Sequence, residues 1–146
     1  MNRRQFVLIV AAAGVACACG SSGHATAAEP SAPVDVGVIT DYPRDGAFDK
    51  FAKDKRVMLV RAGDRLYATS ATCTHRNCAL KSVAGDIRCG CHGSRFSLDG
   101  TVIKGPARDP LPRYAIADTN GRITVDPSKK FSQNDWDNPA SYVRIA

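Results

Sequence analysis

From residue 34 onward, hydrophobic and polar positions alternate over short runs, the two-residue period of β-strands rather than the longer period of helices. Turn-forming pairs such as Asp99-Gly100 and Asn120-Gly121 separate the runs. The predicted strands cover 34–39, 56–61, 66–70, 86–89, 101–103, 113–117 and 122–125. Many short strands at close spacing predict an all-β fold built from antiparallel sheets.

The N-terminal segment has a different pattern. Two arginines, Arg3 and Arg4, precede an apolar run over 6–19, and small residues follow it. These are the three parts of an export signal. The apolar run is shorter than the about 17–25 residues that a membrane-spanning helix needs. The Arg3-Arg4-Gln5-Phe6 stretch resembles a twin-arginine signal, whose pathway carries folded proteins, and this predicts a periplasmic or other extracytoplasmic location.

The boundaries of the domain follow from these patterns. The small residues Ala25-Thr26-Ala27 predict cleavage after residue 27, so that 1–27 form the signal and 28–33 a linker. Imperfect lipobox patterns before Cys17 and Cys19 leave a lipid anchor as the alternative. Residues 34–126 are the predicted domain, and 127–146 a C-terminal extension packed on it by aromatic side chains. Those aromatic residues are Phe131, Trp136 and Tyr142.

Two hexapeptides hold every cysteine and histidine of this domain. CTHRNC spans 73–78 and CGCHGS spans 89–94, and together they contain four of the six cysteines and two of the three histidines. One thiolate and one imidazole from each hexapeptide would make four ligands. Such a set suits a tetrahedral zinc site. Zinc modules, however, usually pair Cys-x2–4-Cys or His-x3–5-His. The competing interpretation is a [2Fe–2S] cluster in which two histidines replace two cysteines on one iron.

Cys78 and Cys91 remain after this ligation, one in each hexapeptide. Disulfides persist outside the cytosol, so in an exported protein a bridge between these two residues would tie the hexapeptides together. Two free, buried thiols are the alternative.

The two hexapeptides resemble the paired cluster-binding boxes of the Rieske iron–sulfur family, and the resemblance extends over roughly 34–126. Gly105-Pro106-Ala107 resembles the third, proline-containing loop of that family. The resemblance implies an antiparallel β sandwich with a small cluster-binding subdomain formed by loops 73–80 and 89–96. It also implies a disulfide between Cys78 and Cys91. The implied ligands of the [2Fe–2S] cluster are Cys73 and Cys89 on the buried iron, and His75 and His92 on the outer iron.

The sequence departs from the family pattern at several places. Arg76-Asn77 stands where quinol-oxidising cytochrome bc complexes usually have Leu-Gly, and Gly90 stands where proline is common. Phe96 occupies the place of a tyrosine found in high-potential members, whereas Ser94 is retained. The residues expected around the cluster are Ser94, Phe96, Gly105 and Pro106.

The resemblance implies a one-electron carrier with no catalytic site of its own. Histidine ligation places such clusters at about −150 to +300 mV. The predicted role is a stand-alone carrier, or a small subunit of a periplasmic oxidoreductase, that serves redox protein partners such as an oxidoreductase large subunit or a cytochrome. The alternatives are the Rieske subunit of a divergent quinol-oxidising cytochrome bc complex and a dioxygenase-type ferredoxin. A membrane contact is expected only through a lipid anchor or an uncleaved signal.

Charge narrows the choice of partners. The net charge is +6, and the basic residues do not form runs interleaved with aromatic residues, so nucleic acid is not an expected partner. Four basic residues flank the hexapeptides, and they form either a positive rim that steers an acidic partner or ordinary solvated charge. They are Arg76, Lys81, Arg88 and Arg95.

Overall fold

The computed structural model describes residues 32–146. The predicted signal, its cleavage site, the lipobox patterns and residues 28–31 of the predicted linker lie outside these residues. Within 32–146, no helix is long and apolar enough to cross a membrane.

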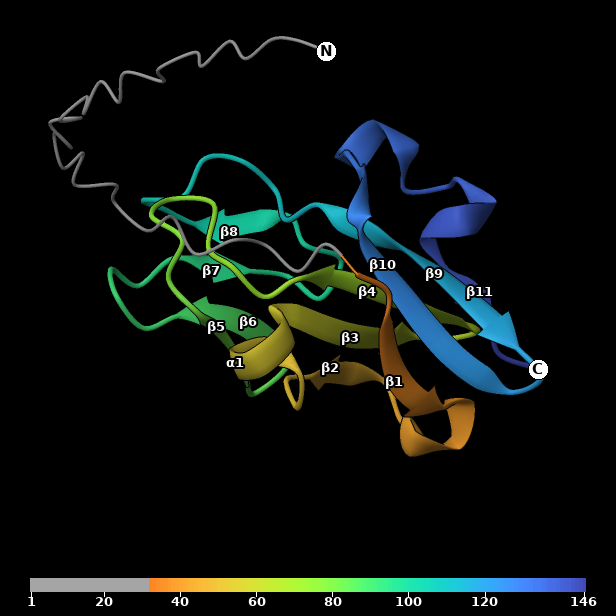
Figure 1. Ribbon diagram of the computed structural model, residues 1–146. Helices are drawn as coiled ribbons and strands as arrows, with labels where there is room; N and C mark the ends of the chain where they lie inside the picture. The colour runs from red at the N-terminus through yellow and green to blue at the C-terminus, as the bar shows by residue number, and fades with distance from the viewer. Residues whose placement is uncertain (1–31) are drawn as a thin grey trace, which may run out of the picture.

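The larger of two antiparallel sheets forms most of the molecule (Figure 1). Its strands lie in the order β1-β10-β9-β4-β3-β2, and β11 pairs with β4. The strands are β1 (Val34–Val38), β2 (Gly46–Phe48), β3 (Val57–Ala62), β4 (Arg65–Ser70), β9 (Arg113–Thr119), β10 (Arg122–Phe131) and β11 (Val143–Arg144). Short helical segments η1 (Ile39–Asp41) and α1 (Ala52–Lys55) connect β1, β2 and β3.

Strand β3 is buried on both faces and separates two hydrophobic cores. Successive side chains of a strand point to opposite faces. Val57 and Leu59 accordingly pack into one core with Tyr114 of β9, whereas Met58 and Val60 pack into the other. The second core also contains Cys73 and Cys89, one cysteine of each hexapeptide, so the larger sheet supports the candidate site directly.

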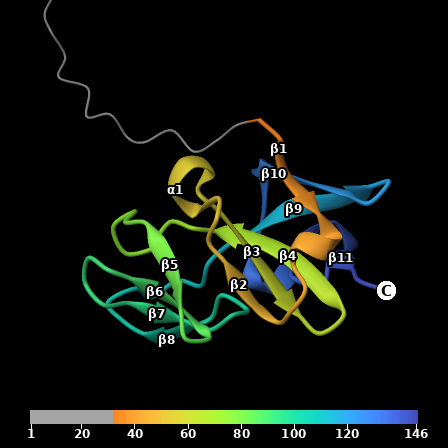
Figure 2. The same cartoon turned by 90° about the horizontal axis from the view of Figure 1, so that it is seen from below.

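The smaller sheet has the order β5-β6-β7-β8 and lies beside the larger one in both views (Figures 1 and 2). Its strands are β5 (Leu80–Val83), β6 (Asp86–Cys89), β7 (Arg95–Phe96) and β8 (Val102–Lys104). Leu80 pairs with Cys89, and Ile87 with Phe96, and all four side chains are buried toward the larger sheet. The subdomain that carries the loops is therefore a sheet in its own right.

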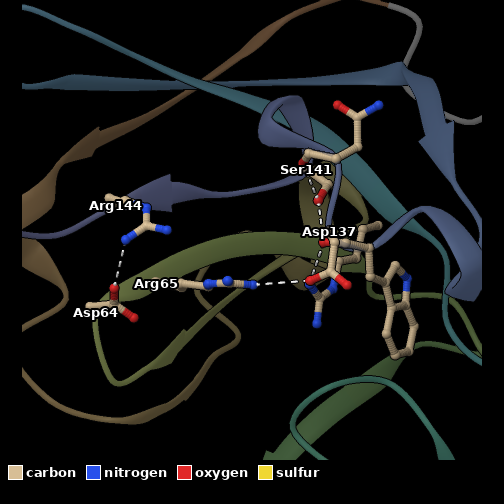
Figure 3. Close-up of polar contacts among 8 residues, drawn as sticks. Asp64, Arg65, Asp137, Ser141 and Arg144 are labelled. Carbon is tan, nitrogen blue, oxygen red and sulfur yellow. Dashed lines mark hydrogen bonds and ion pairs between the residues drawn. The ribbon is translucent and has the colours of Figure 1, made fainter.

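The C-terminal segment is tied to strand β4 and its hairpin (Figure 3). After β10, the chain forms η2 (Gln133–Asp135) and η3 (Pro139–Ser141) before β11 pairs with β4. Arg65 and Asp137 lie 3.4 Å apart, as do Arg144 and Asp64. The hydroxyl of Ser141 donates to the carbonyl of Trp136 at 2.7 Å.

The predicted all-β fold class is confirmed, with differences in individual strands. The predicted strand 86–89 coincides with β6, whereas 122–125 underestimates β10, which continues past a register shift between Asp126 and Lys130. Four short strands were not predicted: β2, β5, β7 and β11. They contain two to four residues each, too few to display a period, and only their pairing with neighbouring strands defines them.

Candidate metal centre

Three loops leave the same end of the smaller sheet. The first, 71–79, runs from β4 to β5; the second, 90–94, joins β6 to β7; the third, 105–112, runs from β8 to β9. The antiparallel register places the start of β5 beside the end of β6, and the start of β7 beside the end of β8. The two hexapeptides, 16 residues apart at their first cysteines in the sequence, therefore meet at one edge.

Two free cysteines form the buried part of the site. Cys73 is 1% exposed and Cys89 is 4% exposed, and they are the free cysteines of the described chain. Burial raises the pKa of the Cys73 thiol, and the neighbouring Cys89 thiol raises it further. Hydrogen bonds from the backbone N–H of His75 and from the Ser94 side chain act in the opposite direction. The two sulfur atoms thus lie close together, with donors directed at one of them.

Two histidines form the outer part of the site. The ring centroids of His75 and His92 lie 5.0 Å apart, with the rings nearly perpendicular at 88°. His75 is half-buried and His92 is exposed. The potential donor atoms thus run from buried sulfur to surface nitrogen, as the sequence resemblance implies.

A disulfide between Cys78 and Cys91 joins the first loop to the second, and the predicted pairing is confirmed. The sulfur atoms of Cys78, Cys89 and Cys91 all lie within 4.8 Å of one another. Two of these three sulfurs are consumed by the disulfide and cannot act as thiolates. The pair available for a metal is therefore Cys73 and Cys89.

The turn of the first loop depends on Asn77. Its φ angle is +58°, a left-handed conformation that asparagine tolerates better than most residues other than glycine. Its backbone N–H donates to the carbonyl of Cys73 at 2.9 Å, and the N–H of Cys73 donates to the carbonyl of Cys78 at 2.8 Å. Asn77 thus adopts a left-handed conformation at the position where quinol-oxidising cytochrome bc complexes usually have glycine.

The third loop covers the second through a contact between Ala107 and Ser94, which the sequence did not predict. The backbone N–H of Ala107 donates to the buried hydroxyl of Ser94 at 3.0 Å. The peptide bond before Pro106 is cis, and both Gly105 and Pro106 are exposed. Phe96 is fully buried beneath the loops, in the core that also holds Cys73 and Cys89. No sequence pattern identifies a backbone donor such as that of Ala107.

A hollow of about 340 Å³ opens beside His75. It lies between the first and third loops, which the hydroxyl of Thr74 joins by donating to the carbonyl of Asp109 at 2.7 Å. The residues around it are Thr74, His75, Pro106, Arg108 and Asp109. Arg108 and the half-buried imidazole of His75 therefore border the same hollow. The sequence did not predict this position of Arg108.

The comparisons with known proteins agree with this geometry. A family profile described as the Rieske [2Fe-2S] domain matches residues 32–115. The chain belongs to the Rieske [2Fe–2S] family. It is 39% identical over 93 residues to the cytochrome b6-f complex iron-sulfur subunit of Chlorobaculum tepidum, an alignment that covers 62% of this chain and 51% of that protein. The corresponding subunit of Chlorobaculum thiosulfatiphilum is 42% identical over 82 residues, covering 54% of this chain and 45% of the relative. The Rieske chain thus spans about half the length of these relatives.

Solved structures give the same family and fold. The crystal structure of the cyanobacterial plasma membrane Rieske protein PetC3 from Synechocystis PCC 6803 superposes with a TM-score of 0.53 at 34% identity, covering 63% of this chain and 97% of that one. A chain in the complex of reduced oxygenase and oxidized ferredoxin of carbazole 1,9a-dioxygenase reaches a TM-score of 0.52 at 22% identity, covering 71% and 100%. The second likeness concerns the fold alone.

The donor set fits the cluster that the family carries. Two adjacent buried thiols and two neighbouring imidazoles supply the sulfur and nitrogen donors of a histidine-ligated [2Fe–2S] cluster. The predictions of a Rieske domain, of its [2Fe–2S] cofactor and of a one-electron carrier built on it are confirmed.

Proposed function

We propose that Cys73, His75, Cys89 and His92 hold the cluster, and that this Rieske protein passes single electrons between redox proteins outside the cytoplasm. The assignment rests on one observation: two of the four cysteines in the hexapeptides form a disulfide and the other two are free. Cys78 and Cys91 are joined to each other, which leaves one buried thiol and one histidine in each hexapeptide.

When bound, the cluster accepts and releases one electron at a time. The protein holds its cysteines in a water-excluding core, where the backbone N–H of His75 and the side chain of Ser94 direct hydrogen bonds to Cys73. The imidazoles lie at the surface, and His92 is the more exposed of the two. Electrons therefore have a short path from the core to a partner that contacts the histidines.

The class of partner rests on the surface of the first loop. Arg76 is exposed, and within residues 32–146 it makes no hydrogen bond or ion pair. A free guanidinium beside His75 disfavours docking into an apolar crater, because the charge would have to be desolvated. We therefore propose a soluble redox protein, or the large subunit of an oxidoreductase, as the partner.

The alternative role is that of a Rieske subunit in a quinol-oxidising cytochrome complex. The Chlorobaculum relatives favour it, since both are cytochrome b6-f complex iron-sulfur subunits. Copurification distinguishes the two roles: a cytochrome b that remains with the native protein after detergent extraction would favour the alternative.

Location follows from the predicted signal. The pattern of Arg3-Arg4 before an apolar run supports export through the twin-arginine route, with a lipid anchor at Cys17 or Cys19 as the alternative to cleavage after residue 27. Fractionation of cells, with intact-mass measurement of the exported protein, tests this proposal. A mass that matches the chain from Ala28 would establish cleavage, and a larger mass carrying acyl chains would establish lipidation.

The ligand assignment is tested by His75→Ala, His92→Ala and Cys73→Ser, each purified after aerobic expression. All three variants should lose the low-average-g rhombic electron paramagnetic resonance signal and the two equivalents of iron, because each removes one of four ligands. Arg76→Ala is the matched control in the same loop and should keep both. A full-intensity signal in either histidine variant would contradict the assignment.

A further inference from the structure

Four basic residues face one another across the entire width of the smaller sheet. Lys81 pairs with Arg88, Arg88 with Arg95, and Arg95 with Lys104, so that one residue comes from each of β5, β6, β7 and β8. Neighbouring strands lie about 4.8 Å apart, which gives this basic row a length of about 14 Å. Three of its members flank the hexapeptides in the sequence, but Lys104 joins them only through strand pairing.

Lys81, Arg88 and Arg95 occupy the outer face of the sheet, and Lys104 is exposed opposite Arg95, at a register shift between β7 and β8. Side chains alternate along each strand, and Leu80, Cys89 and Phe96 turn inward to the core. Their sequence neighbours Lys81, Arg88 and Arg95 consequently face away from it, half-buried or exposed.

Such a row carries an energetic cost. Like charges directly opposite one another in an antiparallel sheet destabilise it, whereas opposite charges stabilise it. The carboxylate of Asp86 offsets part of this cost, since it accepts hydrogen bonds from Arg95 and lies 3.5 Å from Arg88. Within the described part of the chain, the side chains of Lys81 and Lys104, at the two ends, make no hydrogen bond or ion pair. The row therefore keeps a net positive charge.

The row lies directly below the loops of the metal centre. Arg88 precedes Cys89, Arg95 follows Ser94, and Lys104 precedes Gly105. The loop that carries the exposed His92 joins the two central strands of the row. A protein that covers the row is thus placed next to the more exposed imidazole.

Apolar side chains flank the row on the same sheet. Val83 of β5 is 38% exposed and Ile103 of β8 is 51% exposed, two of the three large hydrophobic residues that are exposed within residues 32–146. Asp49 lies at the β5 edge, where it accepts a hydrogen bond from the backbone N–H of Ser82 at 3.1 Å. Charged residues steer a partner and fix its orientation, and small apolar contacts add buried area once it has docked.

We propose that the basic row is the docking surface for an acidic face of a protein redox partner, with His92 on the side that the partner approaches. This inference rests on the proposed electron-carrier function. A protein fits better than an anionic membrane, because the face carries no aromatic side chain to insert into lipid and lies next to the imidazole through which an electron must leave. In the docked pair, one electron leaves the reduced Rieske protein and reduces the partner.

The experiment measures the second-order rate at which an acidic c-type cytochrome oxidises the reduced holoprotein, with ferric haem accepting one electron to become ferrous. Stopped-flow traces at increasing ionic strength give the electrostatic contribution. Lys81→Glu/Lys104→Glu should slow the reaction at low salt by about 10-fold or more, and should flatten its dependence on salt. Both substitutions lie at the exposed ends of the row and touch no proposed ligand.

The matched control is Arg44→Glu/Arg144→Glu, which changes the net charge equally. Arg144 lies 3.4 Å from Asp64 in the β3–β4 turn, and Arg44 precedes Asp45, which accepts from Gly63 in the same turn at 3.0 Å. This end of the molecule is opposite to the loops. The control should slow the reaction less than about 2-fold. Equal slowing by both variants would overturn the proposal, because only the total charge would then matter.

Two further measurements separate the possible failures. In sedimentation with vesicles of phosphatidylcholine and phosphatidylglycerol, the unaltered protein and Lys81→Glu/Lys104→Glu should bind the vesicles equally little. If the unaltered protein binds them, the variant does not, and the cytochrome rate is the same for both, the row would be assigned to a membrane instead. Protein-film voltammetry of every variant should show the same reversible one-electron couple. Absence of that couple in the unaltered protein would refute the electron-carrier function itself, whereas a normal couple with a row-independent rate would refute only the docking surface.

Discussion

The backbone N–H of Ala107 donates a 3.0 Å hydrogen bond to the hydroxyl of Ser94, and both residues are buried. Because the oxygen accepts this bond, the hydroxyl proton of Ser94 remains available, and a hydrogen bond from the Ser94 side chain acts to lower the pKa of the Cys73 thiol. The third loop thus holds a donor of the second loop beside a cysteine of the first. Three segments that are separate in sequence therefore meet at Ser94.

Ser94→Ala should lower the midpoint potential of the holoprotein by tens of millivolts. A hydrogen bond to a charged group contributes about 1.5–3 kcal/mol, and part of this differs between the oxidised state and the more negative reduced state. For one electron, about 1.4 kcal/mol corresponds to about 59 mV. Protein-film voltammetry at one pH measures the change. Ser82→Ala in β5 is the control and should leave the potential unchanged; an equal potential in Ser94→Ala and the unaltered protein would contradict the role of this hydroxyl.

Phe96→Tyr should raise the midpoint potential by tens of millivolts. Phe96 is fully buried in the core that contains Cys73 and Cys89, so a hydroxyl on this ring would add a donor near the ligand sulfurs. Voltammetry gives the potential, and a crystal structure of the variant shows whether the new hydroxyl reaches a sulfur. Phe96→Leu, which adds no donor, is the control. A potential that stays the same or falls, with the hydroxyl in contact with sulfur, would refute this explanation.

Removing the disulfide should make the metal centre less persistent to heat. Cys78 and Cys91 are 13 positions apart. In the chain-entropy model, a disulfide that closes a loop of this size stabilises the folded protein by about 3 kcal/mol, because it lowers the entropy of the unfolded chain. Cys78→Ala/Cys91→Ala should therefore bind the cluster but lose its visible absorbance at a lower temperature than the unaltered protein. Identical thermal profiles would show that the bridge does not stabilise the loops. Alkylation followed by intact-mass measurement should label neither residue in the exported holoprotein.

The stacked side chain of Arg113 should stabilise the attachment of the C-terminal segment. Its guanidinium lies 3.7 Å from the ring centroid of Tyr67 and 4.4 Å from that of Trp136. Burial raises the pKa of Tyr67 to about 12, so the ring stays neutral and the contact is a cation–π interaction. Arg113→Ala should lower the free energy of unfolding by about 1–3 kcal/mol, measured by chemical denaturation.

Two variants test whether stacking is responsible. Arg113→Lys keeps the charge but lacks the planar guanidinium, so it should recover only part of the loss. Arg144→Ala removes an exposed ion pair with Asp64 and should change the free energy of unfolding by less than about 0.5 kcal/mol. Full recovery in Arg113→Lys would show that charge alone matters.

Short-range features of the site could be predicted from the sequence. The alternation of Asp86, Ile87, Arg88 and Cys89 predicts strand β6, because the two-residue period is a local property of an extended chain with one buried face. The grouping of cysteines and histidines in two hexapeptides predicts the chemistry of the centre, because ligand type depends on residue identity and not on the path of the chain.

Tertiary structure decided everything that depends on contacts between distant segments. Strand β7 contains only Arg95 and Phe96 and exists because β6 and β8 pair with it on both sides. The same pairing brings Lys104 into the basic row, and the return of the third loop places the N–H of Ala107 on Ser94. Strand register and loop closure are set by the packing of the whole core, so no local pattern of hydrophobic and polar residues could have specified them.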